Sequence, residues 1–365
     1  MTGPDRLAAA RRILDELEVD GLLVSRSAAK RWLSGFALRP GEEPTAGYAG
    51  TLVVTRDRQL VLADGRYLEQ ARAQAPGWEV RRTTRRLAPE LADLAPDLKV
   101  RRLAAEASVL SHADWAALEE AGLDLVPADA ALARLRLRKG PDEVAAIARA
   151  CALTDACFEH LLGYVHPGLT ERQVARQIAA WFDEHGAEAL AFEPLVLVGP
   201  RAAMPHGHAT EAPVTTGQPL LLDFGCQVDG YRSDMTRTVW IGSEPDAEAR
   251  RRYEAVREAQ QRAFEAAAPG VTGVDLDAVA RGHLADAGLA ETFLHGLGHG
   301  IGLETHEAPI LREYRAPLEA GMVITLEPGT YHSGELGIRI EDTVHLTDAG
   351  AVRLTDAPRE LLVIG

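Results

Sequence analysis

Three histidines and four glycines share one short stretch of the chain, residues 293–309, which reads FLHGLGHGIGLETHEAP. His295, His299 and His306 lie where glycine, having no Cβ, lets backbone or ligand approach closely. Neutral imidazole is the commonest metal ligand, so a metal site is one interpretation. A phosphate-binding loop is disfavoured, because the glycines recur at every second position and no capped helix is expected to follow. This stretch alone leaves open that the histidines only fill a turn.

Two aspartates supply the first candidate partners. Asp223 follows the apolar run 220–222, and Asp234 comes eleven positions later, with Gly225 and Gly230 between them. The two carboxylates can therefore meet across a hairpin. Taken singly, each aspartate is typical of a turn.

Two glutamates favour a metal site over the interpretation that the aspartates are turn residues. Glu327 ends the β-type run 322–326 directly before a proline, and Glu341 lies inside the alternating run 338–346. A buried carboxylate is costly unless it is paired or binds a metal. Four carboxylates and one imidazole carry a charge of −4, which two divalent ions would cancel. One zinc ion uses only three or four ligands, so a dinuclear centre is favoured. Oxygen-rich ligation without cysteine indicates Mn²⁺, with Co²⁺ or Zn²⁺ as alternatives.

Five segments resemble, in order, the metal-binding signature of the pita-bread metallopeptidases: LDFG (222–225), SDMTR (233–237), GHGIG (298–302), LEPG (326–329) and RIED (339–342). That family includes prolidase, aminopeptidase P, methionine aminopeptidase and creatinase. The first domain is similar to the N-terminal domain of prolidase, aminopeptidase P and creatinase. The presence of all five ligands argues against metal-free creatinase and catalytically dead relatives. The loop 37–50 departs from the family by its length and its Pro and Gly content.

The resemblance implies a role for each residue of the site. It assigns the metal ligands as a set in which Asp234 and Glu341 bridge two ions: Asp223, Asp234, His299, Glu327 and Glu341. Glu327 would also accept the proton of the attacking water. His206 and His306 would contact substrate near the scissile bond, His306 as an oxyanion partner. His295 is a substrate-binding candidate, and His208 is expected to have only a core or surface role.

Proline lacks an N–H and has a fixed φ, so the bond before it needs a dedicated enzyme. The additional N-terminal domain favours Xaa-Pro cleavage over methionine removal. The predicted function is that of an Xaa-Pro dipeptidase (prolidase) acting on short proline-containing peptides. The alternatives are aminopeptidase P, methionine aminopeptidase and a non-catalytic peptide-binding relative. Arg339 or Arg39 could read the substrate carboxylate. Otherwise Arg39 is a solvated loop charge and Arg339 a partner of Glu341.

The composition narrows the class of protein. The chain has 365 residues, 46% of them hydrophobic, enough for two domains or one large one. A formal net charge of −15 argues against nucleic acid or an anionic membrane as partner. Three cysteines without a close pair argue against a disulfide framework and for a reducing cytoplasm. We expect no signal peptide and no membrane-spanning run. The resemblance to the pita-bread metallopeptidases also predicts a homodimer.

The expected elements define two domains. Helices at 4–18 and 67–74 alternate with β-type runs at 21–25, 51–55, 60–63, 78–82 and 100–104, which predicts an α/β domain over 1–131. The basic segment 132–141 is interpreted as a linker. In 142–365, two helices followed by strands occur twice, which predicts an α+β pita-bread domain of two pseudo-two-fold halves with the site between them. The helices are expected from 142 to about 166, and at 171–182, 245–267 and 274–287, the strands at 195–198, 220–224, 322–326 and 338–346.

Overall fold

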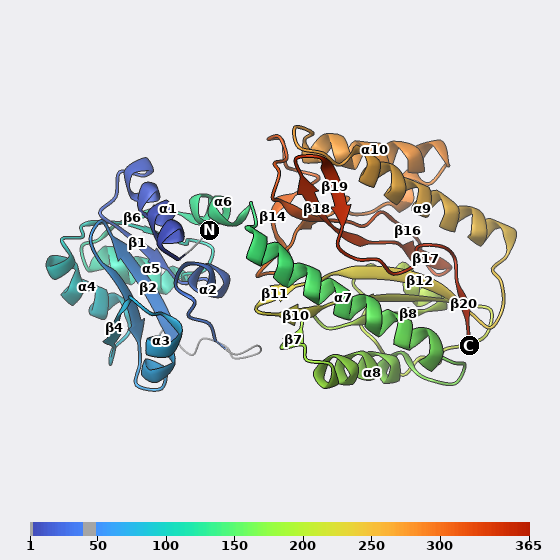
Figure 1. The fold of residues 1–365 in the computed structure, drawn as a ribbon, viewed down its shortest axis with the longest axis horizontal. Helices are drawn as coiled ribbons and strands as arrows, with labels where there is room; N and C mark the ends of the chain where they lie inside the picture. Colours follow the sequence, from blue (N-terminus) through green and yellow to red (C-terminus); the bar gives the residue numbers. More distant parts are fainter. Residues whose placement is uncertain (1–2, 39–48) are drawn as a thin grey trace. The chain divides into compact units, whose positions relative to one another are not determined.

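The structure is a computed structural model that describes residues 3–38 and 49–365 (Figure 1). The chain divides into two compact units, Met1–Arg136 and Leu137–Gly365. Of the residues expected to form a linker, 132–136 belong to the helix that ends the first unit, and Pro141 begins the first helix of the second unit. The loop 37–50 falls largely outside the described residues.

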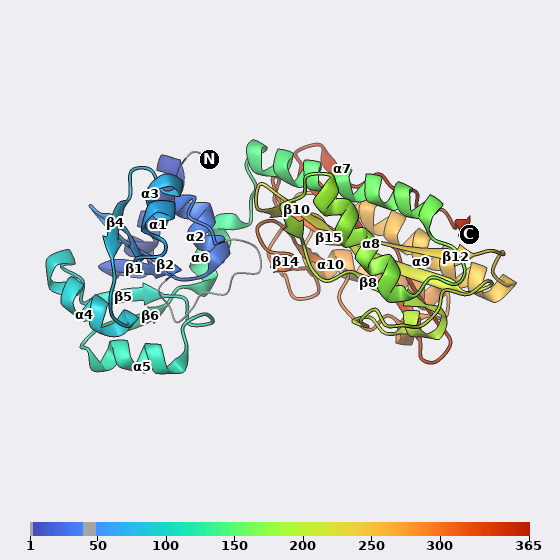
Figure 2. The same cartoon turned by 90° about the horizontal axis from the view of Figure 1, so that it is seen from below.

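The N-terminal unit is a six-stranded mixed sheet covered by helices. The strand order is β4-β3-β2-β1-β5-β6, with β2 antiparallel to both β1 and β3 and the other neighbours parallel. Figure 2 shows α4 and α5 on one face and α1, α2 and α3 on the other. The elements are α1 (Gly3–Glu16), β1 (Gly21–Val24), α2 (Ser27–Ser34), β2 (Ala49–Thr55), β3 (Gln59–Ala63), α3 (Leu68–Gln74), β4 (Glu79–Arg82), α4 (Leu87–Leu98), β5 (Arg102–Ala105), α5 (His112–Glu120), β6 (Asp124–Pro127) and α6 (Asp129–Arg136).

Helix α4 has no counterpart among the elements expected from the sequence. It holds Pro89 in its first turn, where proline removes no needed donor. Pro96 lies near its end, and Leu91, Leu94 and Leu98 pack into the sheet core. Burial of these leucines stabilises the helix although the two prolines would favour a break in it.

The first half of the C-terminal unit runs from two helices into an antiparallel sheet. Helix α8 begins at the predicted capping box, in which Thr170 N donates to Gln173 Oε1 at 2.8 Å. Strand β9 is buried along its whole length and pairs antiparallel with β8 and β12. The elements are α7 (Pro141–Tyr164), α8 (Glu171–Glu184), β7 (Ala189–Leu190), β8 (Leu195–Val198), the 3₁₀ helix η2 (Gly199–Ala203), β9 (Pro219–Phe224), β10 (Cys226–Val228), β11 (Tyr231–Arg232) and β12 (Met235–Ile241).

The second half repeats this order. Strands β13, β15, β18 and β19 form an antiparallel sheet with β14 at its edge, and the predicted strand at 338–346 is interrupted at Ile340 and Glu341. The elements are α9 (Ala247–Ala266), α10 (Gly273–Asp286), η3 (Ala290–Thr292), β13 (His299–Gly300), β14 (Glu307–Ile310), β15 (Val323–Leu326), β16 (Gly329–His332), β17 (Leu336–Arg339), β18 (Asp342–Thr347), β19 (Gly350–Arg353) and β20 (Val363–Ile364).

Each half buries its own hydrophobic core. Helices α7 and α8 pack on the first sheet, and α9 and α10 pack on strands β15, β17 and β18 (Figure 1). The two N-caps occupy equivalent positions, since Thr170 bridges Pro213 and Thr272 bridges Pro317. The final strand breaks the repeat, because β20 follows the second half yet pairs parallel with β12 of the first. The pseudo-two-fold α+β architecture predicted from the sequence is confirmed.

Two further observations concern the whole chain. Among the described residues, no helix is both long enough and apolar enough to cross a bilayer. All three cysteines lie in the C-terminal unit, are buried and are free: Cys151, Cys157 and Cys226.

Candidate metal centre

The five predicted metal ligands come from strand ends of both halves. Asp223 lies in β9 opposite Thr236 of β12, and Asp234 directly precedes β12. His299 begins β13, Glu327 follows β15, and Glu341 lies between β17 and β18. The hairpin proximity predicted for the two aspartates follows from the β9–β12 ladder. Four of the five side chains are buried, and only Glu327 is half-buried.

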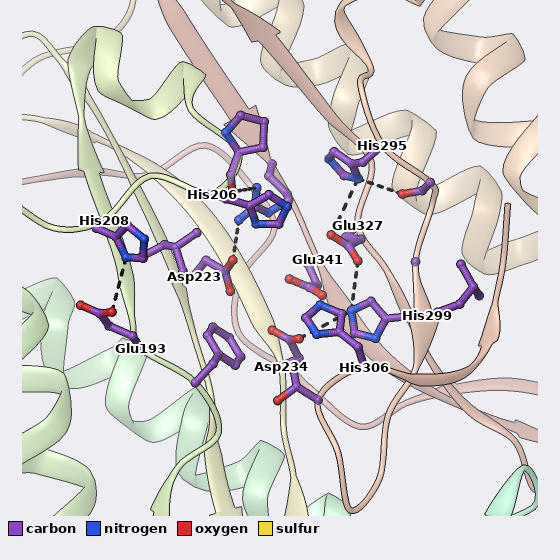
Figure 3. A pocket seen from close by; sticks show the side chains of 18 residues that line it. Glu193, His206, His208, Asp223, Asp234, His295, His299, His306, Glu327 and Glu341 are labelled. Carbon is purple, nitrogen blue, oxygen red and sulfur yellow. Dashed lines mark hydrogen bonds and ion pairs between the residues drawn. The ribbon is translucent and has the colours of Figure 1, made fainter. Parts of the chain in front are cut away.

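The ligand atoms converge on one point (Figure 3). One ligand atom each of Asp234, His299 and Glu341 lie within 4.8 Å of one another. His299 Nε2 is 3.3 Å from Glu327 Oε1 and 3.8 Å from Asp234 Oδ2. His299 Nδ1 is 3.1 Å from Gly300 O. An Nδ1–H donated to that carbonyl directs Nε2 at the carboxylates. Without metal, the hydrogen bond and attraction to Glu327 outweigh burial and raise the pKa of His299, so Nε2 holds a proton that a bound metal would replace.

Three carboxylate oxygens at this point have no hydrogen-bond partner among the described residues: Asp223 Oδ1, Asp234 Oδ1 and Glu341 Oε1. Buried oxygen atoms without a donor are rare in folded proteins and need an explanation. Divalent cations are suitable partners for such a set, because they neutralise several carboxylates at once. The residues present therefore fit a metal centre.

Crowding of the carboxylates shifts their pKa values in different directions. Burial, followed by repulsion from neighbouring carboxylates, raises the pKa values of Asp234 and Glu341 well above the ordinary range. Burial also raises the pKa of Asp223, and Arg339 opposes the shift. Burial alone would raise the pKa of Glu327 too, but the hydrogen bond and charge of His299 lower it to about 2. Glu327 thus stays ionised beside an imidazole.

Arg339 is embedded among the carboxylates instead of standing free in the cavity. Its Nη2 donates to Asp223 in a short ion pair, its Nε donates to Thr236 Oγ1 at 3.0 Å, and its Nη1 donates to Tyr331 Oη at 2.8 Å. Its exposed fraction is 3%. Of the two interpretations offered for Arg339, this geometry resembles the partner of a ligand, with Asp223 and not Glu341 as the contact.

Two neighbours of the ligands were not singled out from the sequence. Thr236 donates its hydroxyl to Glu341 Oε2 at 2.6 Å, and Tyr331 contacts both Arg339 and His295. Thr236 stands in the SDMTR segment two positions after Asp234, and that spacing on a strand could have signalled it. Tyr331 had no comparable signal.

Three of the cavity histidines outside the ligand set are candidates for substrate contact, and their surroundings differ. His206 and His306 are exposed, and the His306 ring lies 4.3 Å from the ring of His299. His295 Nε2 is 2.8 Å from Tyr331 Oη. Because Arg339 donates to that hydroxyl oxygen, the Tyr331 hydroxyl is free to donate to His295. Burial lowers the pKa values of His295 and His306, with the charge of His299 adding to the effect on His306.

Glycines let the histidine strand approach its neighbours. A Cβ on Gly298 would lie 2.1 Å from Thr325 O, so only glycine fits beside His299. A Cβ on Gly337 would lie 1.8 Å from Ala202 O, so β17 can lie directly against η2 only because of this glycine. These contacts join strands of the second half to each other and to the first half.

The ligands line a cavity with a volume of about 440 Å³. Apolar side chains form part of its wall: Phe192, Leu195 and Ile310. His208 also lines it, with Nδ1 3.4 Å from Glu193 Oε2, and both side chains are exposed (Figure 3). His206, His295 and His306 line the same cavity. Arg39 lies outside the described residues.

The fold and the site together define a metallopeptidase. The sequence profile of Metallopeptidase family M24 matches residues 145–348, and that of the Creatinase/Prolidase N-terminal domain matches residues 6–138. The chain belongs to Metallopeptidase family M24.

Particular relatives refine this class. The chain is 42% identical over 229 residues to the Xaa-Pro dipeptidase of Pyrococcus furiosus, covering 62% of this chain and 66% of that protein. It superposes on the Xaa-Pro dipeptidase from Bacillus anthracis with a TM-score of 0.93 and 34% identity, covering 100% of both chains. The X-Pro aminopeptidase from Thermotoga maritima gives a TM-score of 0.87 at 32% identity, covering 98% of this chain and 99% of that one.

Proposed function

We propose that this enzyme is a dinuclear, metal-dependent Xaa-Pro dipeptidase (prolidase). The main supporting observation is that Asp223, Asp234 and Glu341 each have a buried carboxylate oxygen without a donor, in the cavity that His299 also lines. The relatives named Xaa-Pro dipeptidase support the substrate class. The residues that would hold the ions are Asp223, Asp234, His299, Glu327 and Glu341, and the family resemblance would assign Asp234 and Glu341 to both ions. Their oxygen-rich chemistry favours Mn²⁺, with Co²⁺ or Zn²⁺ as alternatives.

Two bound divalent ions would supply Lewis acidity and lower the pKa of a shared water toward neutrality. The residues of the chain supply the remaining steps. Glu327, half-buried beside His299, would accept a proton at its carboxylate. His206 and His306 contact the peptide on either side of the scissile bond, and His306 donates to the developing oxyanion. His295, oriented by Tyr331, holds the substrate against the cavity wall.

A peptide panel tests the substrate class. Rates are compared for Xaa-Pro dipeptides, Xaa-Pro-Yaa tripeptides and Met-Ala peptides, with the Mn²⁺ form of the protein. We expect cleavage before proline, fastest for dipeptides. Preference for Met-Ala peptides would instead support a methionine aminopeptidase. Absence of any hydrolysis by metal-loaded protein would support a non-catalytic peptide-binding relative.

One observation favours aminopeptidase P as the second candidate. Among the described residues that line the cavity, Arg339 is the only arginine or lysine, and Asp223, Thr236 and Tyr331 already engage it. A dipeptide brings a free carboxylate that needs a cation, whereas a longer peptide does not. Arg39 remains the proposed cation for this carboxylate.

Comparison of Arg39→Ala with the parent enzyme decides between the candidates. Loss of a charge-assisted contact should raise the activation free energy that corresponds to kcat/KM for a dipeptide by about 1.5–3 kcal/mol. The value of kcat/KM for the tripeptide should stay unchanged. Equal effects on both peptides would remove the length-reading role and favour aminopeptidase P.

The proposal includes a cytoplasmic location and a homodimer. Three buried, unpaired thiols are consistent with a reducing compartment. The homodimer rests on the family resemblance alone, and sedimentation of the metal-loaded protein would test it.

A further inference from the structure

His206 is carried by a connection between β8 and β9 that crosses the rim of the cavity. The side chain is exposed, and regular structure in this connection ends at η2. A catalytic histidine on such a segment needs an anchor, because a displacement of about 1 Å can cost ~10²-fold in rate. The anchor is a carboxylate that lies outside the metal centre.

That carboxylate belongs to Glu171, the first residue of α8, whose exposed fraction is 0%. Its Oε1 accepts from Val198 N at 2.9 Å, and its Oε2 accepts from Thr210 N and Thr210 Oγ1, both at 2.8 Å. Arg201 Nε donates to both oxygens at 2.9 and 3.0 Å. Glu171 does not line the cavity.

These donors enclose the histidine in the sequence. Val198 precedes the connection and Thr210 follows His208, so one carboxylate joins the two ends of residues 199–209. Within residues 199–209, Arg201 Nη2 donates to His208 O at 2.7 Å. Both the entry and the exit of the His206 segment are therefore attached to a single buried charge, and hydrogen bonds to an ionised acceptor are the strong ones.

The second half has an analogous arrangement. Asp277 of α10 accepts from Leu297 N at 2.8 Å and is paired with Arg281 at 3.0 Å. Arg281 donates to Phe293 O at 3.0 Å and to His295 O at 2.8 Å. In each half, a buried carboxylate on the second helix works with an arginine to hold the segment that carries a cavity histidine.

We propose that Glu171 and Asp277 are positioning residues, Glu171 for His206 and Asp277 for His295. The inference rests on the proposed function, in which His206 acts near the scissile bond and His295 holds substrate. It assigns the two carboxylates different kinetic signatures. Displacement of His206 lowers kcat, and displacement of His295 raises KM.

The test substitutes each carboxylate by its amide in the full-length, Mn²⁺-loaded enzyme. In Glu171→Gln, one carboxylate oxygen becomes an amide NH₂, so either Val198 N or Thr210 N faces a donor, and Arg201 loses one of its two acceptors in both orientations. Glu184→Gln, on the exposed end of the same helix, is the matched control. Asp277→Asn is paired with Asp286→Asn, exposed on α10. We expect Glu171→Gln to lower kcat about 10- to 100-fold, Asp277→Asn to raise KM about 10-fold, and neither control to change.

Double variants separate positioning from general destabilisation. In a His206→Ala background, Glu171→Gln should cause no further loss of kcat, because the group it positions is already absent. An equal loss in both backgrounds would overturn the proposal. Should Glu171→Gln fold poorly, Thr210→Val removes one donor and keeps the charge, and a smaller loss of kcat with the same dependence on His206 is expected.

Histidine NMR makes failure of this inference distinguishable from failure of the proposed function. With labelled histidine and diamagnetic Zn²⁺ in place of paramagnetic Mn²⁺, the signal missing in His206→Ala identifies the His206 ring. Glu171→Gln should shift that signal, and Glu184→Gln should not. If His206→Ala keeps full activity, the catalytic role of His206 is wrong, while a shifted signal still supports positioning. An unchanged signal in Glu171→Gln overturns the positioning role whatever the activity.

Discussion

The two halves of the catalytic unit share a fold plan but contribute to the centre in different ways. The first half supplies Asp223 from β9 and Asp234 from the position directly before β12, and these two strands pair in one regular ladder. The second half supplies its ligands from irregular points: a two-residue strand with a register shift at His299, and strand ends at Glu327 and Glu341. Regular pairing positions Asp223, whereas His299 lies in a short irregular strand whose neighbour Gly298 allows close approach to Thr325 O.

Electrostatics differ between the halves as well. The aspartates of the first half have raised pKa values, and their cationic neighbour Arg339 comes from the second half. The second half pairs Glu327 with its own His299 and so keeps one carboxylate strongly acidic. The second half thus holds one carboxylate with a raised pKa, Glu341, and one with a lowered pKa, Glu327, whereas both aspartates of the first half have raised pKa values.

Removal of one ligand from each half should give the largest effect. Asp234→Ala and Glu341→Ala should both lose metal and all measurable peptidase activity, because each is proposed to be shared by the two ions. Chelation should abolish activity in the parent enzyme, and Mn²⁺ or Co²⁺ should restore it there only. Metal content by mass spectrometry accompanies each assay. Full activity in the chelated protein would refute the metal centre.

Substitution of the two exposed histidines, one in each half, compares the contributions of the halves to catalysis. His206→Ala, in the first half, and His306→Ala, in the second, should each lower kcat by about 10²-fold, the scale for a positioned proton donor or oxyanion partner. Bound metal should remain unchanged in both variants. A variant that loses metal would identify that histidine as a ligand.

Two buried threonines offer a smaller, matched test. Thr236 donates to Glu341 Oε2 at 2.6 Å, across the halves, and Thr325 donates to Glu327 Oε1 at 3.3 Å, within one half. Loss of such a partner typically weakens metal affinity by about 10- to 100-fold. We expect Thr236→Val to reach that range and Thr325→Val to fall below it, measured by competition with a chelating dye. The reverse order would show that the second half depends more on its outer contacts.

The pH dependence of metal binding should give the smallest effect. Asp234 and Glu341 have pKa values raised above those of the unfolded chain, so without metal the folded protein binds more protons and loses stability as pH rises through that window. Metal must displace these protons, so the increase in Tm caused by Mn²⁺ should be larger at about pH 8 than at about pH 6. In calorimetry, each kcal/mol by which Mn²⁺ stabilises the protein more at the higher pH should appear as about 2–4 °C of additional increase in Tm. A pH-independent increase would mean that the carboxylates are already ionised without metal.

Much of the centre could be predicted because its residues conflict with their local context. Glu327 and Glu341 place charges in apolar β runs, and the glycine-rich histidine stretch fits neither helix nor phosphate loop. The capping box at Thr170 and the strand at 195–198 follow from local patterns alone, and the structure has both.

Residues that hold the centre could not be found in this way, because their partners are distant in sequence. Glu171 in a first helical turn is ordinary, since the helix dipole favours an acid there. Its contacts with Val198 and Thr210 lie 27 and 39 residues away. Likewise Arg237, 1% exposed, has its charge partner in Asp342 of the other half, at 2.7 Å and 105 residues away.

The short strand β20 has a consequence for unfolding. The chain leaves the second half, and Ala357 O and Pro358 O accept hydrogen bonds from the buried Arg237 of the first half. The chain then ends in β20, paired beside Trp240 of β12. Separation of the two halves would break these contacts and expose the edge of β12 and the buried Arg237. The two halves are therefore expected to unfold together. The most protected backbone amides of β9 and β15 should therefore show the same free energy of opening in hydrogen exchange, as parts of a single cooperative foldon.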